Sequence, residues 1–391
     1  KENKARVIAF YLPQYHPIPE NDKYWGKGFT EWTNVAKAKP LFRGHYQPHI
    51  PADLGFYDLR LPEVREAQAE LARDAGIEGF CYYHYWFGNG KMLLQKPFEE
   101  VLRLGKPDFP FCLCWANHDW TTKTWVKGSS MVNNTMIAQQ EYLGEQDDIK
   151  HFEYCLRAFK DHRYITIEGK PIFLIYDPLS FPNVKEFMNR WNFLAKKNNL
   201  KGIYFIGVTT GRQSSYKIVT NLGFDGVCHN RRWEAEAKAA GFRFVRRMQS
   251  LLGWHLGISL MKYDYNKVVR NYDTPENKLE NCYPVITPGF DRTPRAGRRA
   301  GIYVNSSPKN FKKHVAEVCK SIQDKDDDHR LVFLSAWNEW GEGNYMEPDL
   351  RFGKQYIEAC RQTINAFDWT MDGTLSVSYT HLRAHETSQD L

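Results

Sequence analysis

Eight apolar segments of strand length alternate with helix-forming segments along most of the chain. A continuous apolar run bounded by turn residues is typical of a buried parallel strand. The expected strands span residues 6–12, 77–83, 109–115, 171–176, 203–208, 226–228, 283–287 and 331–337. The expected helices span residues 61–75, 97–104, 144–161, 184–198, 213–222, 308–323 and 354–366. This alternation predicts an α/β protein that forms a single (β/α)8 barrel.

Polar and aromatic residues follow nearly every one of these strands. An open, doubly wound sheet would concentrate them at one switch point, so their spread favours the closed barrel. The 391 residues suffice for one large barrel domain, which we place at residues 1–370. Residues 231–282 form an expected insertion, with amphipathic pieces such as FRFVRRMQSLLGW that suit a partly helical cover. Residues 375–391 are polar and aperiodic, and we expect a non-native or disordered tail there.

The composition excludes several classes of function. The net charge of +7 is mild for this length and lacks long basic runs, which argues against a nucleic-acid partner. No apolar run of about 18 residues predicts a membrane span, and we expect a soluble protein. The start of the chain, KENKARVIAF, lacks the apolar stretch of a signal peptide, which leaves the compartment open. The eight cysteines are scattered, and we expect reduced core thiols. Oligomeric state is hidden.

The stretch LVFLSAWNEWGEGNYMEPD, residues 331–349, carries the strongest chemical signal. Its apolar strand runs into a loop with Glu339, Glu342 and Glu347 among aromatic and glycine residues. Acids just past the end of a barrel strand lie where this fold places its chemistry. Paired carboxylates beside aromatic rings are typical of enzymes that cleave sugar linkages, where one acid protonates the leaving oxygen and rings stack on the sugar. The alternative is that these are solvated loop acids.

Further candidates for binding sugar lie in the long first loop and at other strand ends. They supply hydroxyl, amide, imidazole and carboxylate groups or flat rings, and for each the alternative is an ordinary structural role. The candidates are Tyr15, His16, Trp32, Tyr83, His84, Trp115, Asn117, His118, Asp177, His229, Asp291, Trp337, Trp340 and Glu347. The histidine and cysteine spacings show no metal-binding signature, and no glycine-rich phosphate motif occurs. These spacings predict no metal site.

Together these motifs resemble the WbsX-type glycosyl family, which is related to glycoside hydrolase family 99, the endo-acting α-mannosidases. The segments that carry the resemblance are AFYLPQYHPIPEND, WGKGFTEWTNV, GFCYYHYWF, CWANHDWT, YPVITPGFDRTPR and SAWNEWGEGNYMEPD. They are spread over residues 5–349, and as an ensemble they are highly specific. One position departs from the pattern, because His118 stands where the resemblance leads us to expect an acid.

The resemblance implies a (β/α)8 barrel that hydrolyses an α-mannoside-like bond with retention and without a cofactor. By the same resemblance, Glu339 acts as the base on the sugar 2-hydroxyl, and Glu342 acts as the general acid. The substrate would be an oligosaccharide or polysaccharide. Two alternatives remain: a glycosyltransferase in surface-polysaccharide (O-antigen, capsule or lipopolysaccharide) biosynthesis, and a glycan-binding barrel without catalysis.

Overall fold

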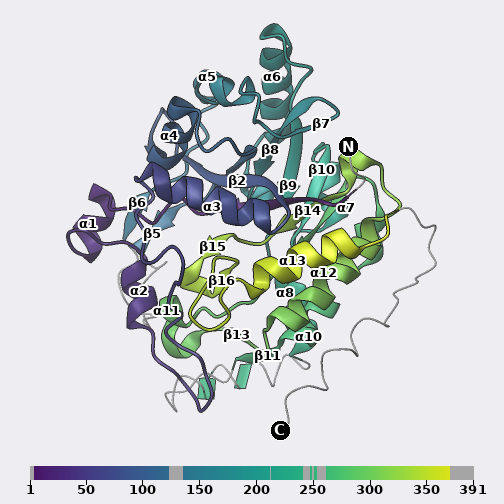
Figure 1. Cartoon of the computed structure of the whole chain (residues 1–391). Helices are drawn as coiled ribbons and strands as arrows, with labels where there is room; N and C mark the ends of the chain where they lie inside the picture. Colours follow the sequence, from purple (N-terminus) through teal and green to yellow (C-terminus); the bar gives the residue numbers. More distant parts are fainter. Residues whose placement is uncertain are drawn as a thin grey trace.

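The protein folds into a closed barrel of eight parallel strands, as the alternating pattern predicts (Figure 1). The computed structural model describes residues 4–122, 135–211, 213–240, 247–248, 251–252 and 261–369. The barrel strands are β1 (Arg6–Tyr11), β2 (Ile77–Trp86), β4 (Phe111–Trp115), β8 (Lys170–Ile175), β9 (Tyr204–Val208), β10 (Gly226–His229), β12 (Cys282–Ile286) and β14 (Leu331–Leu334). Parallel pairing of β1 with both β2 and β14 closes the ring.

The helices between the strands lie around the outside of this ring. They are α3 (Pro62–Asp74), α4 (Lys96–Leu104), α5 (Glu145–Phe159), α6 (Val184–Lys197), α7 (Tyr216–Asn221), α12 (Pro308–Ile322) and α13 (Gln355–Ala366). Each expected helix is present within a few residues of its expected bounds. Their buried faces and the strands form one large hydrophobic core in which every barrel strand participates.

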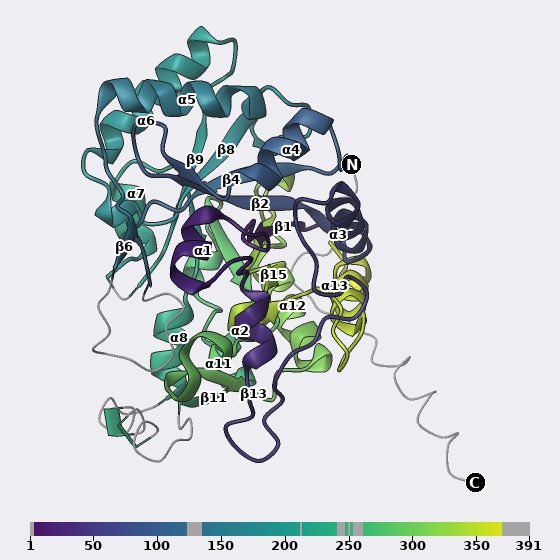
Figure 2. The same cartoon turned by 90° about the vertical axis from the view of Figure 1, so that its left-hand side faces the viewer.

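The long segment after β1 covers the carboxyl-terminal ends of the strands. This segment is not wholly irregular, because it contains two short helices, α1 (Pro19–Trp25) and α2 (Trp32–Lys37). In Figure 2, α1 and α2 lie in the foreground. Smaller elements join them there: the hairpins β5 (Trp120–Thr121) with β6 (Met136–Ala138), and β15 (Asn338–Glu339) with β16 (Asn344–Tyr345).

The insertion between β10 and β12 is partly helical, with α8 (Arg232–Ala239) and α10 (Tyr265–Arg270). It also contains β11 (Lys262–Asp264), which pairs in parallel with β13 (Ile302–Val304) after β12. A small second core of tyrosines and aliphatic residues joins these elements. The expected amphipathic segment 242–254 lies mostly outside the described residues, as does the tail 375–391.

All eight cysteines are buried and free, which confirms the expectation of core thiols. Among the described residues, no helix combines the length and apolar character needed to cross a bilayer.

Candidate active site

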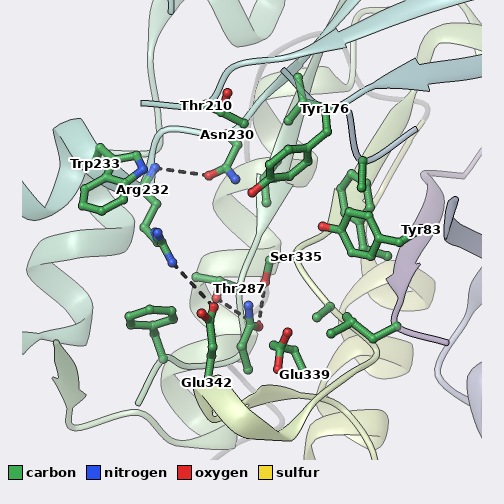
Figure 3. Close-up of a pocket in the computed structure, with 18 of the residues that line it drawn as sticks. Tyr83, Tyr176, Thr210, Asn230, Arg232, Trp233, Thr287, Ser335, Glu339 and Glu342 are labelled. Carbon is green, nitrogen blue, oxygen red and sulfur yellow. Dashed lines mark hydrogen bonds and ion pairs between the residues drawn. The ribbon is translucent and has the colours of Figure 1, made fainter. Parts of the chain in front are cut away.

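A cleft of about 230 Å³ opens among the carboxyl-terminal ends of the barrel strands (Figure 3). Its aromatic lining comes from several strands and loops, and both predicted catalytic acids, Glu339 and Glu342, line it. The aromatic rings that border it include Phe10, Tyr83, Tyr85, Trp120, Tyr176, Trp233, Tyr272, Phe290 and Tyr303. The cleft therefore combines flat apolar surfaces with paired carboxylates, which suits the recognition of a sugar ring.

The hairpin β15–β16 places the two acids. After β14 ends, the chain passes Trp337, whose backbone N–H donates to the Phe10 carbonyl at 2.7 Å. Asn338 does not line the cleft, and its side-chain amide binds the backbone N–H and the carbonyl of Leu12 at 2.8 and 3.1 Å. A 3₁₀ turn at Trp340–Glu342 then brings Glu342 round to the side chain of Glu339. The site loop is thus hydrogen-bonded directly to β1.

Arg295 joins the two acids. It belongs to the short helix α11 (Thr293–Ala296). Its Nη2 lies 2.9 Å from Oε1 of Glu339, and its Nη1 lies 2.9 Å from Oε1 of Glu342. The same guanidinium binds Glu31 through Nε and through Nη2, the latter at 2.7 Å. One buried cation therefore contacts three carboxylates.

Glu31 is the buried third acid of this cluster. Its side chain has no solvent exposure, and it also accepts a hydrogen bond from the Gln14 amide. Gly341 permits this arrangement, because a Cβ there would lie 1.9 Å from Oε1 of Glu31. The packing around Glu31 thus requires a residue without a side chain at position 341.

Two further arginines surround Glu342 but not Glu339. Nε of Arg292 lies 3.2 Å from Oε1 of Glu342, and Nη1 of Arg232 lies 3.8 Å from its Oε2. Figure 3 shows the Arg232 side chain reaching Glu342 from across the cleft. The guanidinium of Arg232 also packs on two aromatic rings, with its Cζ 4.7 Å from the ring centroid of Trp233 and 4.6 Å from that of Phe290. The two acids consequently have unequal electrostatic surroundings.

These surroundings move the pKa values of the two acids in opposite directions. Burial raises the pKa of Glu339 well above its ordinary value; the negative charges of Glu31 and Glu342 add to this, and Arg295 opposes it. Burial also acts to raise the pKa of Glu342, but Arg295, Arg232 and Arg292 outweigh it and lower that pKa. Two adjacent acids with separated pKa values are the usual arrangement for one proton donor and one carboxylate.

Of the other sequence-predicted residues, Tyr83 and His118 line the cleft with the two acids. Several others support the site loop from behind. Trp32 packs on Trp340 at 5.4 Å, and Tyr15 accepts a hydrogen bond from the Trp340 backbone N–H at 3.0 Å. Trp337 is fully buried. Glu347 accepts hydrogen bonds from Tyr57, Gln68 and Trp340 at 2.7–2.9 Å.

The remaining predicted residues do not line the cleft and make structural contacts. Asn117 donates to the Asp177 carbonyl at 2.8 Å, and Asp177 caps the turn that begins at Pro178. His229 contacts Asn277 at 3.1 Å. The others of this group are His16, which is buried with its pKa lowered by burial to about 4, and Trp115, whose indole donates to the Trp86 carbonyl.

Asp291 lines a neighbouring cavity of about 360 Å³ instead of the cleft. Its carboxylate contacts His45 at 2.7 Å and accepts from Gln47 at 2.8 Å. The neighbouring arginines Arg292 and Arg295 contact Glu342 and Glu339.

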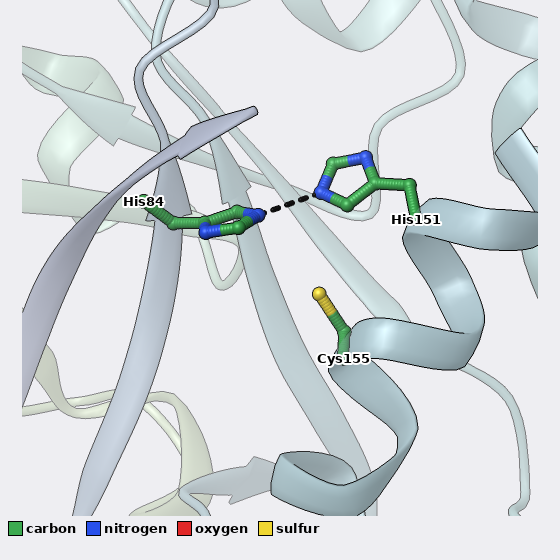
Figure 4. A group of neighbouring side chains, drawn as sticks. All are labelled: His84, His151 and Cys155. Atoms are coloured by element: carbon green, nitrogen blue, oxygen red, sulfur yellow. Dashed lines mark hydrogen bonds between the residues drawn. The ribbon is translucent and has the colours of Figure 1, made fainter. Parts of the chain in front are cut away.

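His84 lies with His151 and Cys155 in the group of described residues whose ligand-type atoms come within 4.8 Å of one another (Figure 4). Nε2 of His84 and Nε2 of His151 are 2.8 Å apart and share a hydrogen bond. Burial lowers the pKa of His84 to about 3, and Trp86 stacks on His151 with ring centroids 4.5 Å apart. The pair thus fills an aromatic part of the core between β2 and α5.

Sequence reasoning missed the roles of Arg295 and Glu31. Each lies in a segment that the sequence singles out, FDRTPR and FTEWTNV, but neither follows a barrel strand directly. Their burial and their ion pair form only when α2 and α11 come together.

The fold and the cleft define a (β/α)8 barrel with paired carboxylates at its carboxyl-terminal mouth. The chain belongs to the family described as glycosyltransferase WbsX, whose profile matches residues 7–360. It is 34% identical over 361 residues to the uncharacterized protein WxcX of Xanthomonas campestris pv. campestris, in strains B100 and ATCC 33913. That match covers 92% of this chain but 50% of WxcX, so the chain spans about half the length of these relatives.

Solved structures share the fold at low sequence identity. The family 99 endo-α-mannosidase of Bacteroides thetaiotaomicron superposes with a TM-score of 0.56 and 14% identity, over 93% of this chain and 97% of that one. A glycoside hydrolase-like protein gives a TM-score of 0.57 and 15% identity, over 92% and 94% of the two chains. These likenesses confirm the predicted barrel.

Proposed function

We propose that the protein is a glycoside hydrolase that cleaves an α-linked, mannoside-like glycan with retention of configuration. The observation that carries this proposal is the pair Glu339 and Glu342, which a single guanidinium bridges at 2.9 Å to each acid inside an aromatic cleft. The membership in the WbsX family and the barrel shared with family 99 support it.

The proposed chemistry needs one protonated acid and one carboxylate that both act on the same sugar residue. The protonated acid donates to the glycosidic oxygen, and the alcohol of the leaving group departs. The carboxylate removes the proton of the 2-hydroxyl, whose oxygen closes on the anomeric carbon to give an anhydro-sugar. Water then opens this ring as both protons return, so the net reaction is hydrolysis with retention.

The lining of the cleft supports a sugar as the substrate. Tyr83 and Tyr176 face the acids across the opening (Figure 3), and Trp233 borders it with 40% of its surface exposed. Such rings stack on the apolar faces of sugars. Polar groups at the floor, including Ser335 and Thr287, suit hydrogen bonds to hydroxyl groups.

The test is turnover of a panel of α-linked oligosaccharides and bacterial polysaccharides, with released sugars separated by anion-exchange chromatography. We expect the parent chain to cleave at least one glycan, and Glu339→Gln and Glu342→Gln each to lose at least about a hundredfold in rate. The exposed Glu153 on α5 provides the matched control Glu153→Gln, which should retain parent activity. Undiminished turnover in both site variants would contradict the proposal.

A glycosyltransferase is the second candidate, because the family carries that description. It would use the same acids to move a sugar from an activated donor to a glycan acceptor. Labelled nucleotide sugars and lipid-linked sugars, each incubated with acceptor glycans, separate the two functions. Transfer of label without hydrolysis of any glycan would favour the transferase.

A further inference from the structure

The cavity of about 360 Å³ that Asp291 lines lies directly beside the cleft. Phe290 and Tyr303 line both hollows, and their ring centroids are 5.3 Å apart. The backbone N–H of Asp291 donates to the carbonyl of Glu342 at 2.6 Å, which fastens the wall of this cavity to a site acid. The volume falls in the range of small-molecule sites, roughly 300–1,000 Å³. The cavity therefore has the place and the size to hold a further part of a glycan that enters the cleft.

Aromatic rings from three separate segments line this cavity. The long loop after β1, the segment from the end of β12 through β13, and the start of the closing helix supply Phe42, Tyr46, Phe290, Tyr303, Phe352 and Tyr356. The rings from the first loop and from the region of α13 are partly exposed. Partly exposed flat rings around a hollow are surfaces on which sugars stack.

The two carboxylates of the cavity are occupied by partners within the protein. Both oxygens of Asp291 are held, by three polar groups at 2.7–2.9 Å. Asp349 accepts through both oxygens from the Tyr345 hydroxyl and from two backbone N–H groups, at 2.6–3.0 Å. Asp291 and Asp349 are buried, with 6% and 5% of their surfaces exposed. These acids therefore hold the walls of the cavity together.

Two cations that border the cavity have no such partners. Cζ of Arg351 lies 4.8 Å from the ring centroids of both Tyr46 and Phe352. Nζ of Lys262 lies 4.5 Å from the ring centroid of Phe42. Both cationic residues are exposed, and neither forms an ion pair with a carboxylate in the described part of the chain. A guanidinium that packs on rings keeps its in-plane N–H donors available for an oxyanion.

We propose that this cavity binds an anionic sugar residue of the glycan, with Arg351 binding its carboxylate or phosphate group. The partly exposed rings contact the face of the sugar, and Lys262 adds a second positive charge at the rim. The inference rests on the proposed function and narrows its substrate to an acidic glycan.

Calorimetric titration of the whole chain tests the inference with four probes: an oligogalacturonide, its methyl ester, a phosphorylated mannose and mannose itself. Each neutral probe keeps the sugar of its partner and lacks the charge. We expect an acidic probe to bind at least about tenfold more tightly than its neutral counterpart, and Arg351→Gln to remove most of this preference. Arg351→Lys keeps the charge without the planar fork and should retain part of it. The exposed Arg361 on α13 provides the matched control Arg361→Gln, which should bind as the parent does.

The probes also identify the anionic group. A preference for the galacturonide alone indicates a carboxylate, and a preference for the phosphorylated mannose alone indicates a phosphate; either result supports the inference. Equal binding of charged and neutral probes, or no binding of both acidic probes, would overturn it. A preference that Arg292→Gln abolishes and Arg351→Gln leaves intact would also overturn it, because the anion would then lie in the cleft. The same holds if Arg351 contributes to binding a nucleotide sugar but neither acidic saccharide.

This titration measures no turnover, so its failure is distinguishable from failure of the proposed hydrolase function. A chain that cleaves a neutral glycan without Arg351-dependent binding keeps the hydrolase function and loses the acidic site. A chain that binds an acidic probe through Arg351 but cleaves no glycan keeps the acidic site and loses the hydrolase function.

Discussion

Gly341→Ala tests the buried charge cluster more directly than the removal of any charge. The added Cβ would lie 1.9 Å from Oε1 of Glu31, 2.5 Å from its Cδ and 2.9 Å from Nε of Arg295. Non-bonded heavy atoms settle at roughly 3.5 Å, so the carboxylate has to retreat by more than about 1 Å. The side chain of Glu31 has no exposed surface, and the retreat therefore separates it from Arg295.

The cost follows from the kind of interaction that is broken. Removing one partner from a buried ion pair typically costs about 3–5 kcal/mol. Unfolding entropy is about 2.1 cal/mol/K per residue, which for 391 residues converts this loss into a fall in melting temperature of about 4–6 °C. Scanning calorimetry of purified parent and variant at neutral pH measures it.

Gly301→Ala is the matched control for this experiment. A Cβ at position 301 would meet Tyr263 and Phe290 at 3.6 and 3.8 Å, which are ordinary contacts. It should melt within about 1 °C of the parent. If Gly341→Ala also melted within that margin, the carboxylate of Glu31 would not be fixed against position 341, and the described packing of the cluster would be wrong.

Three further changes have defined outcomes. Burial raises the pKa of Glu347 to about 7. The free energy of unfolding of the parent, measured by calorimetry relative to that of Glu347→Gln, should therefore fall by about 3 kcal/mol between about pH 4 and pH 8. A difference that stays constant over this range would contradict the raised pKa. Gly207→Ala would place a Cβ 2.4 Å from Cγ1 of Val219, between β9 and α7, and urea unfolding should show a loss of about 1–3 kcal/mol. Trp233→Ala should lower kcat/KM about tenfold on a cleaved glycan by removing a stacking surface; unchanged kinetics would remove Trp233 from the substrate path.

The barrel was predictable because its determinants are local in the sequence. Each barrel strand is an apolar run between turn residues, and each outer helix has its own periodicity. The short strands β11 and β13 escaped prediction for the opposite reason. Each is three residues long, and their pairing depends on the insertion folding back against the segment after β12.

The acids of the site were predictable because Glu339 and Glu342 follow a strand in a recognisable loop. The unequal surroundings of the two acids were not predictable, because they depend on arginines in and next to α8 and α11 and on an acid that precedes α2. Sequence spacing says nothing of the distance between Glu31 and Arg295, which are 264 positions apart. The pKa order of the pair is thus a property of the tertiary structure.

Several aromatic and polar residues, some of them predicted to bind sugar, hold the site loop in place. Asn338 ties the loop to β1, Tyr15 holds the Trp340 backbone, and Glu347 accepts from the Trp340 indole at 2.7 Å. Trp340 in turn stacks on Tyr345, with ring centroids 3.7 Å apart. Acid–base catalysis depends on groups held in place before the substrate arrives. Much of the aromatic content of this loop therefore supports Glu339 and Glu342 from behind, while a separate set of rings lines the cleft.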